Sequence, residues 1–196
     1  MLVLVFWIFP SFICIGFNDV LKNKYEDKIK LCYTDTDSYV LHVETDDIFE
    51  DFKEMKEHFD FSGYPKDHPN YDNTNCKVLG KFKDEVDGKI ISESIHLKPK
   101  MYCMEILKKE NEAETKGRAK GIPTRAVVKR YGINEYRKTL YEDFKDHISF
   151  NTIRSINHEV FSISCNKLGL SNFDNKRYYT TRIDSLDHGH YKIKQL

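Results

Sequence analysis

The sequence of 196 residues lacks an excess of charge of either sign, because 31 Lys and Arg residues balance 31 Asp and Glu residues. Overall charge therefore gives no support for nucleic-acid binding, and any such site must come from local clustering of cations. The five cysteines are odd in number and include no Cys-x-x-Cys pair, which argues against a disulfide framework and a structural zinc site. A reducing intracellular setting is the expected one.

The sequence also lacks an unbroken apolar segment long enough to span a membrane, which needs about 20 consecutive apolar residues. Its longest apolar run, residues 1–17, is interrupted by Pro10. A cleaved signal peptide is one interpretation, yet the run has no basic start and a poor cleavage site at its end. The alternatives are a buried strand or helix, or a start unrelated to the rest of the chain. We expect no membrane attachment, and no internal repeat is evident.

What the sequence does contain is enough apolar material for a packed core. Hydrophobic residues make up 40% of the chain and aromatic residues 13%, and the length suits one ordinary domain or a compact domain with an appendage. The charged fraction of 32% exceeds the usual quarter. Much of the surface must therefore be ionic.

Two acidic residues one position apart, Asp35 and Asp37, lie between apolar segments at residues 29–33 and 39–43. This layout is typical of a β-hairpin tip. Alternate residues of an extended segment point to the same side, so the two carboxylates can converge. Their repulsion is relieved by a divalent cation such as Mg²⁺ or Mn²⁺, which favours metal-assisted phosphoryl or nucleotidyl transfer. The alternative is that Asp-Thr-Asp-Ser only caps a turn.

The longer string Tyr-Thr-Asp-Thr-Asp-Ser at residues 33–38 resembles motif C of family B DNA polymerases. In that family the motif forms a hairpin turn on an antiparallel palm sheet. The resemblance implies that Asp37 ligates the catalytic Mg²⁺ or Mn²⁺ ions, that Asp35 assists beside it, and that Thr36 lies near the primer DNA.

Four further segments resemble the protein-primed branch of this family, which includes phage, adenoviral and Maverick/Polinton polymerases. They are residues 79–85, residues 98–102, residues 120–122, and a tail at residues 173–177 and 188–191. Lys100 and Tyr102 match a lysine-x-tyrosine motif, which implies contact with the primer; on a strand they would share one face. Lys120 and Gly121 match the point where palm gives way to thumb, within a locally basic stretch that suits DNA phosphates.

The patterning predicts an α+β fold with packed helices. We expect an apolar segment at residues 1–17, a palm part at 18–107, a linker at 108–120 and a small α+β thumb at 121–196. The antiparallel palm sheet should run over residues 29–107, with a helix over 46–58 on one face. Asp87-Gly88 predicts a hairpin turn. Two short helices should follow Pro123 and Gly132, and residues 147–164 should form two strands around a turn at 155–157.

No segment resembles motif A, motif B or the paired acids of an exonuclease. The resemblance therefore implies the C-terminal palm and thumb portion of a DNA-directed DNA polymerase, which performs two-metal nucleotidyl transfer in replication and is inactive alone. The implied partners are primer–template DNA, deoxynucleoside triphosphates and a terminal-protein primer. The implied location is the nucleus or the replication site of a virus or mobile element.

Two other functions remain open from the sequence. One is a DNA-binding remnant that keeps the palm and thumb shape without turnover. The other is a metal-dependent glycosyltransferase, which also uses Asp-x-Asp with Mn²⁺. The residues before Asp35 are too few for the parallel nucleotide-binding sheet of such an enzyme, since one βαβ unit takes about 30 residues.

Overall fold

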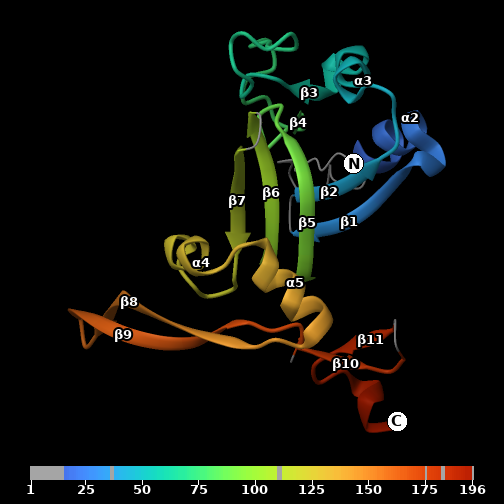
Figure 1. Cartoon of the computed structure of the whole chain (residues 1–196). Helices are drawn as coiled ribbons and strands as arrows, with labels where there is room; N and C mark the ends of the chain where they lie inside the picture. Colours follow the sequence, from blue (N-terminus) through green and yellow to red (C-terminus); the bar gives the residue numbers. More distant parts are fainter. Residues whose placement is uncertain (1–15, 36–37, 110–111, 175, 182–183, 196) are drawn as a thin grey trace.

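The chain combines a β-hairpin, a three-stranded antiparallel sheet and a second, longer hairpin with several short helices (Figure 1). The structure is a computed structural model and describes residues 16–35, 38–109, 112–174, 176–181 and 184–195. The predicted α+β class is confirmed. Of the expected apolar segment at 1–17, residues 1–15 lie outside the described ranges.

The strands are β1 (Ile29–Asp35), β2 (Ser38–Val43), β3 (Phe59–Asp60), β4 (Phe82–Lys83), β5 (Ile90–Lys98), β6 (Met101–Lys109), β7 (Glu112–Arg118), β8 (Asp146–Ile156), β9 (Glu159–Leu170), β10 (Arg177–Tyr179) and β11 (Ser185–Asp187). The helices are η1 (Gly16–Lys22), α2 (Asn23–Tyr25), η2 (Glu26–Lys28), α3 (Ile48–Glu54), η3 (Lys56–His58), α4 (Thr124–Arg130), α5 (Ile133–Glu142) and η4 (Tyr191–Gln195). Within these described elements, no helix is long and apolar enough to cross a membrane.

The β1–β2 hairpin packs against the helical segments that precede and follow it. Leu21 of η1, Leu41 of β2 and Phe52 of α3 are fully buried in one apolar cluster. Burying such side chains contributes roughly 1.5–3 kcal/mol each relative to exposure. This cluster fixes α3 to the hairpin, as the sequence predicted for the helix over 46–58.

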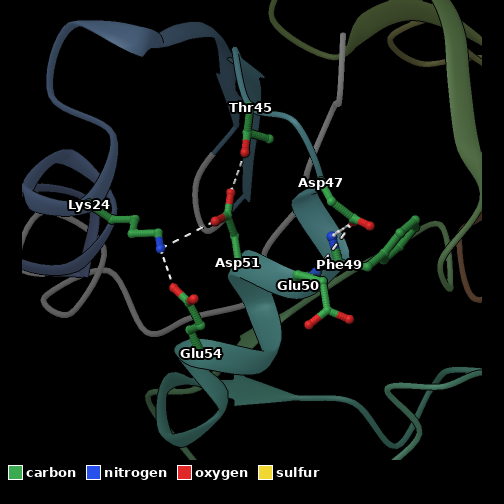
Figure 2. Close-up of polar contacts among 7 residues, drawn as sticks. All are labelled: Lys24, Thr45, Asp47, Phe49, Glu50, Asp51 and Glu54. Carbon is green, nitrogen blue, oxygen red and sulfur yellow. Dashed lines mark hydrogen bonds and ion pairs between the residues drawn. The ribbon is translucent and has the colours of Figure 1, made fainter.

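Polar contacts add to this packing (Figure 2). The Asp47 carboxylate caps α3 by accepting the backbone N–H of Phe49 at 2.8 Å and that of Glu50 at 3.3 Å. Lys24 of α2 reaches across to two acidic side chains of α3, forming an ion pair with Asp51 at 3.2 Å and another with Glu54. The helical start of the described chain is thus tied to α3.

The sheet β5–β6–β7 is covered on both faces. Ile95 and Cys103 lie opposite each other in the register and pack with the helices α4 and α5. The alternate positions Ile91, Met104 and Ile106 face the other way and pack with Val40 of β2. This sheet therefore lies between the two helices and the β1–β2 hairpin, an arrangement that buries Met101, Cys103, Met104 and Ile106 of its central strand.

The single palm sheet expected over residues 29–107 is not formed. Among the described residues, β1 and β2 pair as strands only with each other, and β5, β6 and β7 form a separate sheet. The two units meet through side chains.

The expected linker at 108–120 is also a wrong prediction in part, because β7 pairs antiparallel with β6 from Lys109↔Glu112 to Tyr102↔Arg118. A charged segment can serve as a strand here because it lies at a sheet edge, where its side chains reach solvent.

The turn predicted at Asp87-Gly88 is formed, with positive φ at both residues and the Lys89 N–H donating to the Val86 carbonyl at 3.1 Å, but the described strands on either side of it do not pair as a hairpin. Asp84 is buried at 4% exposure, and its carboxylate accepts the backbone N–H groups of Val86 at 2.9 Å and Gly88 at 2.8 Å. These bonds satisfy backbone groups that a strand partner would otherwise satisfy, and they close a local turn. The preceding strand β4 is only two residues long and pairs parallel with β3.

The C-terminal part begins with α4 and α5, close to the predicted positions, and continues into the long hairpin β8–β9. Asn157 and His158 both have positive φ, which gives the two-residue turn that matches the twist of paired strands. Ile148 and Leu170 anchor the base of this hairpin in the same apolar cluster as Cys103, so the cluster crosses the predicted palm–thumb boundary. Figure 1 shows the rest of β8 and β9 extending away from the body.

Candidate functional site

The motif C-like hairpin forms where the sequence predicted it. Asp35 ends β1 opposite Ser38, the first residue of β2, and the Ser38 hydroxyl donates to the Asp35 carbonyl at 3.0 Å. Thr36 and Asp37 lie outside the described residues. Asp35 is therefore the member of the predicted acidic pair whose surroundings the structure describes.

Lys100 lies beside this hairpin although it is 67 residues away in sequence from Tyr33. Its backbone N–H donates to the Tyr33 hydroxyl oxygen at 2.7 Å, and its Nζ lies 3.7 Å from Oδ1 of Asp35. Lys100 therefore lies beside Asp35. The expectation that Lys100 and Tyr102 lie together on a strand is wrong, because Lys100 sits in the turn between β5 and β6 with φ of 61°.

Tyr102 faces the same hairpin through an aromatic cluster, which we define as Tyr33, His96 and Tyr102. The His96 and Tyr33 rings are stacked with centroids 4.6 Å apart, and the Tyr102 ring lies 5.6 Å from Tyr33 and 5.8 Å from His96. Burial raises the pKa of Tyr33, although the hydrogen bond from Lys100 opposes this. Burial also raises the pKa of Tyr102, with Arg118 opposing and Asp35 adding to the effect.

His96 was missed from the sequence. Burial lowers its pKa to about 4, so the ring is neutral near pH 7. Neither ring nitrogen has a hydrogen-bond partner in the described part of the chain. The signal that could have found it is the strand register, which places His96 directly opposite Tyr102.

Lys120 and Gly121 make their contacts with other elements. Lys120 lines a hollow with Lys98 of β5. The Gly121 carbonyl accepts from the Lys167 Nζ of β9 at 3.3 Å, and its φ of 77° is one that glycine adopts without strain. Among the predicted site residues, the structure thus brings Asp35, Lys100 and Tyr102 together, and it sets Lys120 and Gly121 in a different neighbourhood.

The described metal-ligating side chains do not form a divalent-cation site. In the ranges that the structure describes, no three or more His, Cys, Asp or Glu side chains are grouped so that they could hold a metal ion. The motif C-like hairpin offers one described carboxylate, that of Asp35, and an ammonium group already lies beside it. One carboxylate is a poor site for Mg²⁺, which keeps most of its water unless phosphates join it. The described side chains around Asp35 therefore present an ion pair with Lys100 and not a set of metal ligands.

Comparison with known proteins gives no match: no family model, curated protein or solved structure is similar to this chain. The geometry around Asp35 is therefore the basis for any functional conclusion.

Proposed function

We propose that this chain supplies the palm and thumb of a family B DNA polymerase of the protein-primed type, acting in DNA-directed nucleotidyl transfer during replication. One observation carries the proposal. Residues 33–38 resemble motif C and residues 98–102 resemble the lysine-x-tyrosine motif. These two segments contact each other through the hydrogen bond from Lys100 to Tyr33 and the ion pair of Lys100 with Asp35. A primer terminus and a catalytic carboxylate must lie this close together for the reaction.

In this proposal, the Lys100 ammonium group and the Tyr102 hydroxyl bind the primer. The Lys100 side chain is 60% exposed, so its ammonium group can leave Asp35 and bind a primer phosphate. Tyr102 lies beside it, and its hydroxyl is suited to hydrogen-bond the terminal sugar or phosphate. Both tyrosines of the aromatic cluster are protonated near pH 7, because their ordinary pKa of 10 is far above that pH and burial raises it further; they carry no negative charge.

Mg²⁺ or Mn²⁺ enters the proposal through Asp37, with Asp35 beside it and further carboxylates from a motif A segment that this sequence does not contain. When bound, the ion would supply stabilisation of phosphoryl charge and activation of the primer hydroxyl. Because the described residues provide so few ligands, we propose that the chain alone binds the ion weakly and does not extend a primer.

The proposed partners are primer–template DNA, deoxynucleoside triphosphates and a terminal-protein primer, in a nucleus or at the replication site of a virus or mobile element. The basic stretch after β7 is the proposed thumb contact. Arg125 and Lys129 of α4 are exposed, whereas Arg130 is held by Asp146 at 2.8 Å. Two of the three cations on this helix are therefore available to phosphates.

A DNA-binding remnant is the second candidate, favoured by the ion pair that joins Lys100 to the Asp35 carboxylate. The glycosyltransferase interpretation gains no support. Within the described chain, the residues before β1 are helical, and the one parallel pairing joins strands of two residues each.

Primer extension tests the proposal. The chain is assayed alone and with a supplied polymerase fragment that carries motifs A and B, using Mg²⁺ and a labelled primer–template. We expect extension only by the mixture, and we expect Asp37→Asn to abolish it while Asp27→Asn, an exposed acid in η2, leaves it unchanged.

Three outcomes contradict parts of this reasoning. Extension by the isolated chain overturns the claim that it is inactive alone. Extension by the mixture that survives Asp37→Asn overturns the metal assignment. Binding to primer–template without extension in any mixture selects the remnant, and binding of a UDP-sugar in place of DNA selects the transferase.

A further inference from the structure

A hollow of about 360 Å³ lies next to the β5–β6 turn, with Pro99 of that turn in its wall. Four segments that are distant in sequence form its walls: the β5–β6 turn with Lys98, the residue Lys120 after β7, Leu168 of β9, and the β10–β11 region with Lys176. We call it the basic pocket. At roughly 30 Å³ for each water in the liquid, it has room for about ten water molecules, and so for a hydrated phosphate group.

The acidic groups of the basic pocket are already engaged. Asp187 of β11 pairs with Arg177 of β10 at 3.2 Å, and the Asp174 carboxylate accepts the backbone N–H of Lys176 at 3.0 Å. The Arg177 guanidinium also donates to Ser185. These contacts hold the two carboxylates and the guanidinium in the wall of the pocket.

Three ammonium groups remain, those of Lys98, Lys120 and Lys176. None of them forms an ion pair with a carboxylate in the described ranges. Burial lowers the pKa of Lys98; the Asp174 carboxylate opposes this, and the Lys120 charge adds to it. The two ammonium groups are thus close enough to repel each other, and Lys98 is held in place by its bond to the Phe173 carbonyl at 2.8 Å. An anion in the pocket relieves this repulsion.

The chemistry of the pocket favours a phosphate over a carboxylate. Carboxylates in proteins are matched best by the planar fork of arginine, and here the guanidinium is engaged by Asp187 and Ser185. Lysine ammonium groups act as point charges, and several of them can surround the oxygens of one phosphate without fixing its orientation. Such a site holds a backbone and does not read bases.

We propose that the basic pocket binds a phosphodiester group of a nucleic-acid strand, at a second contact point beyond the Lys100 turn. The choice of nucleic acid as the source of the phosphate rests on the proposed function. The β5–β6 turn carries Lys100, and Pro99 of the same turn lines the pocket together with Lys98, Lys120 and Lys176. A strand bound at Lys100 would therefore have a second contact next to the same turn.

Salt-dependent DNA binding by the full chain tests the proposal, with fluorescence anisotropy of a labelled primer–template duplex as the readout. Lys120 and Lys176 are both exposed, so replacing them with glutamine should not affect folding. Each lost phosphate contact weakens binding about fivefold at 150 mM salt and lowers the slope of log K against log salt by about 0.9. We expect Lys176→Gln to show that change and the Lys120→Gln, Lys176→Gln double variant to show about thirtyfold weaker binding.

Lys66→Gln is the matched control, because Lys66 is an exposed lysine in the loop between β3 and β4. Its binding and salt slope should equal those of the unmodified chain. A second duplex of unrelated sequence should be weakened by the same factors. In parallel, inorganic phosphate is titrated while the backbone amide signals of Leu168 and Lys176 are followed by NMR.

The outcomes separate this proposal from the proposed function. If the chain binds duplex and both pocket variants bind as the control does, the pocket assignment is overturned and the polymerase proposal stands. If the chain binds no DNA but inorganic phosphate shifts the two amides, the pocket takes a free phosphate and the nucleic-acid assignment is overturned together with the proposed function. If neither probe binds, the pocket is no anion site.

Discussion

Acid should destabilise this protein through one side chain, His96. Its ring packs against both Tyr33 and Tyr102, and burial lowers its pKa to about 4 from the ordinary 6.5. Because the folded pKa is lowered, the unfolded chain binds the proton more readily in the window between pH 6.5 and about 4. Stability from this group is therefore fully present above pH 6.5 and is lost as the pH falls through that window.

The size of the loss follows from the two pKa values. One pKa unit corresponds to about 1.4 kcal/mol, so the full difference is worth about 3 kcal/mol, and this is an upper bound because the residue is partly exposed. At pH 5 the loss relative to pH 7.5 is about 2 kcal/mol. A domain of this size has a free energy of unfolding of roughly 5–15 kcal/mol, and its melting temperature should fall by about 4–8 °C.

The assay compares urea unfolding of the unmodified chain with that of His96→Phe at pH 7.5, 6 and 5. Phenylalanine keeps an aromatic ring against the two tyrosines, leaves no hydrogen-bond partner unpaired and cannot titrate. All other groups cancel in the difference between the two proteins, which should reach about 2 kcal/mol at pH 5. His147→Gln, at an exposed position of β8, should follow the unmodified chain. If the unmodified chain and His96→Phe lose stability in parallel, His96 is not the buried neutral ring described above.

Two further changes test the packing and the capping of helices. Gly169→Ala would put a Cβ atom 2.3 Å from the hydroxyl oxygen of buried Tyr131, and we expect the free energy of unfolding to fall by about 1–3 kcal/mol. Thermal unfolding measures this. Gly132→Ala should show little change, because its Cβ would have its nearest neighbour at 3.5 Å. Asp47→Ala removes the acceptor of two backbone N–H groups at the start of α3 and should lower the free energy of unfolding by about 1 kcal/mol. Urea unfolding of exposed Asp46→Ala gives the comparison, and equal losses for the two variants would rule out the cap.

Local patterns predicted the elements whose signals lie within one stretch of chain. The alternation around Asp35 placed the β1–β2 hairpin, and the acidic turn before Ile48 placed α3, because both depend on neighbouring residues alone. Pro123 opened a helix as predicted, with α4 beginning at Thr124. The turn predicted at 155–157 lies at Asn157 and His158, within the usual error of an element boundary.

The failures share one cause, which is that they depend on partners far away in sequence. The polar residues of β7 look like a linker until β6 is known to lie beside them. The turn at Asp87-Gly88 forms, but no hairpin follows from it, because β4 pairs with the distant strand β3. His96 has no local signature at all, because its contact with two tyrosines depends on the β5–β6 register and on the docking of β1.

The docking of β1 on the sheet determines the geometry around Asp35. Among the described residues, no strand hydrogen bonds join the β1–β2 hairpin to β5–β6–β7, so the position of Asp35 relative to Lys100 depends on side chains. Those side chains are the aromatic cluster and the apolar residues around Val40. Strand pairing would fix this relation in steps of one residue, whereas ring packing allows small sliding. The bond from Lys100 to the Tyr33 hydroxyl adds a direct contact between the turn and β1, next to the ion pair of Lys100 with Asp35. A tyrosine two residues before Asp35 therefore has a physical role of its own: it sets the position of the turn that carries Lys100.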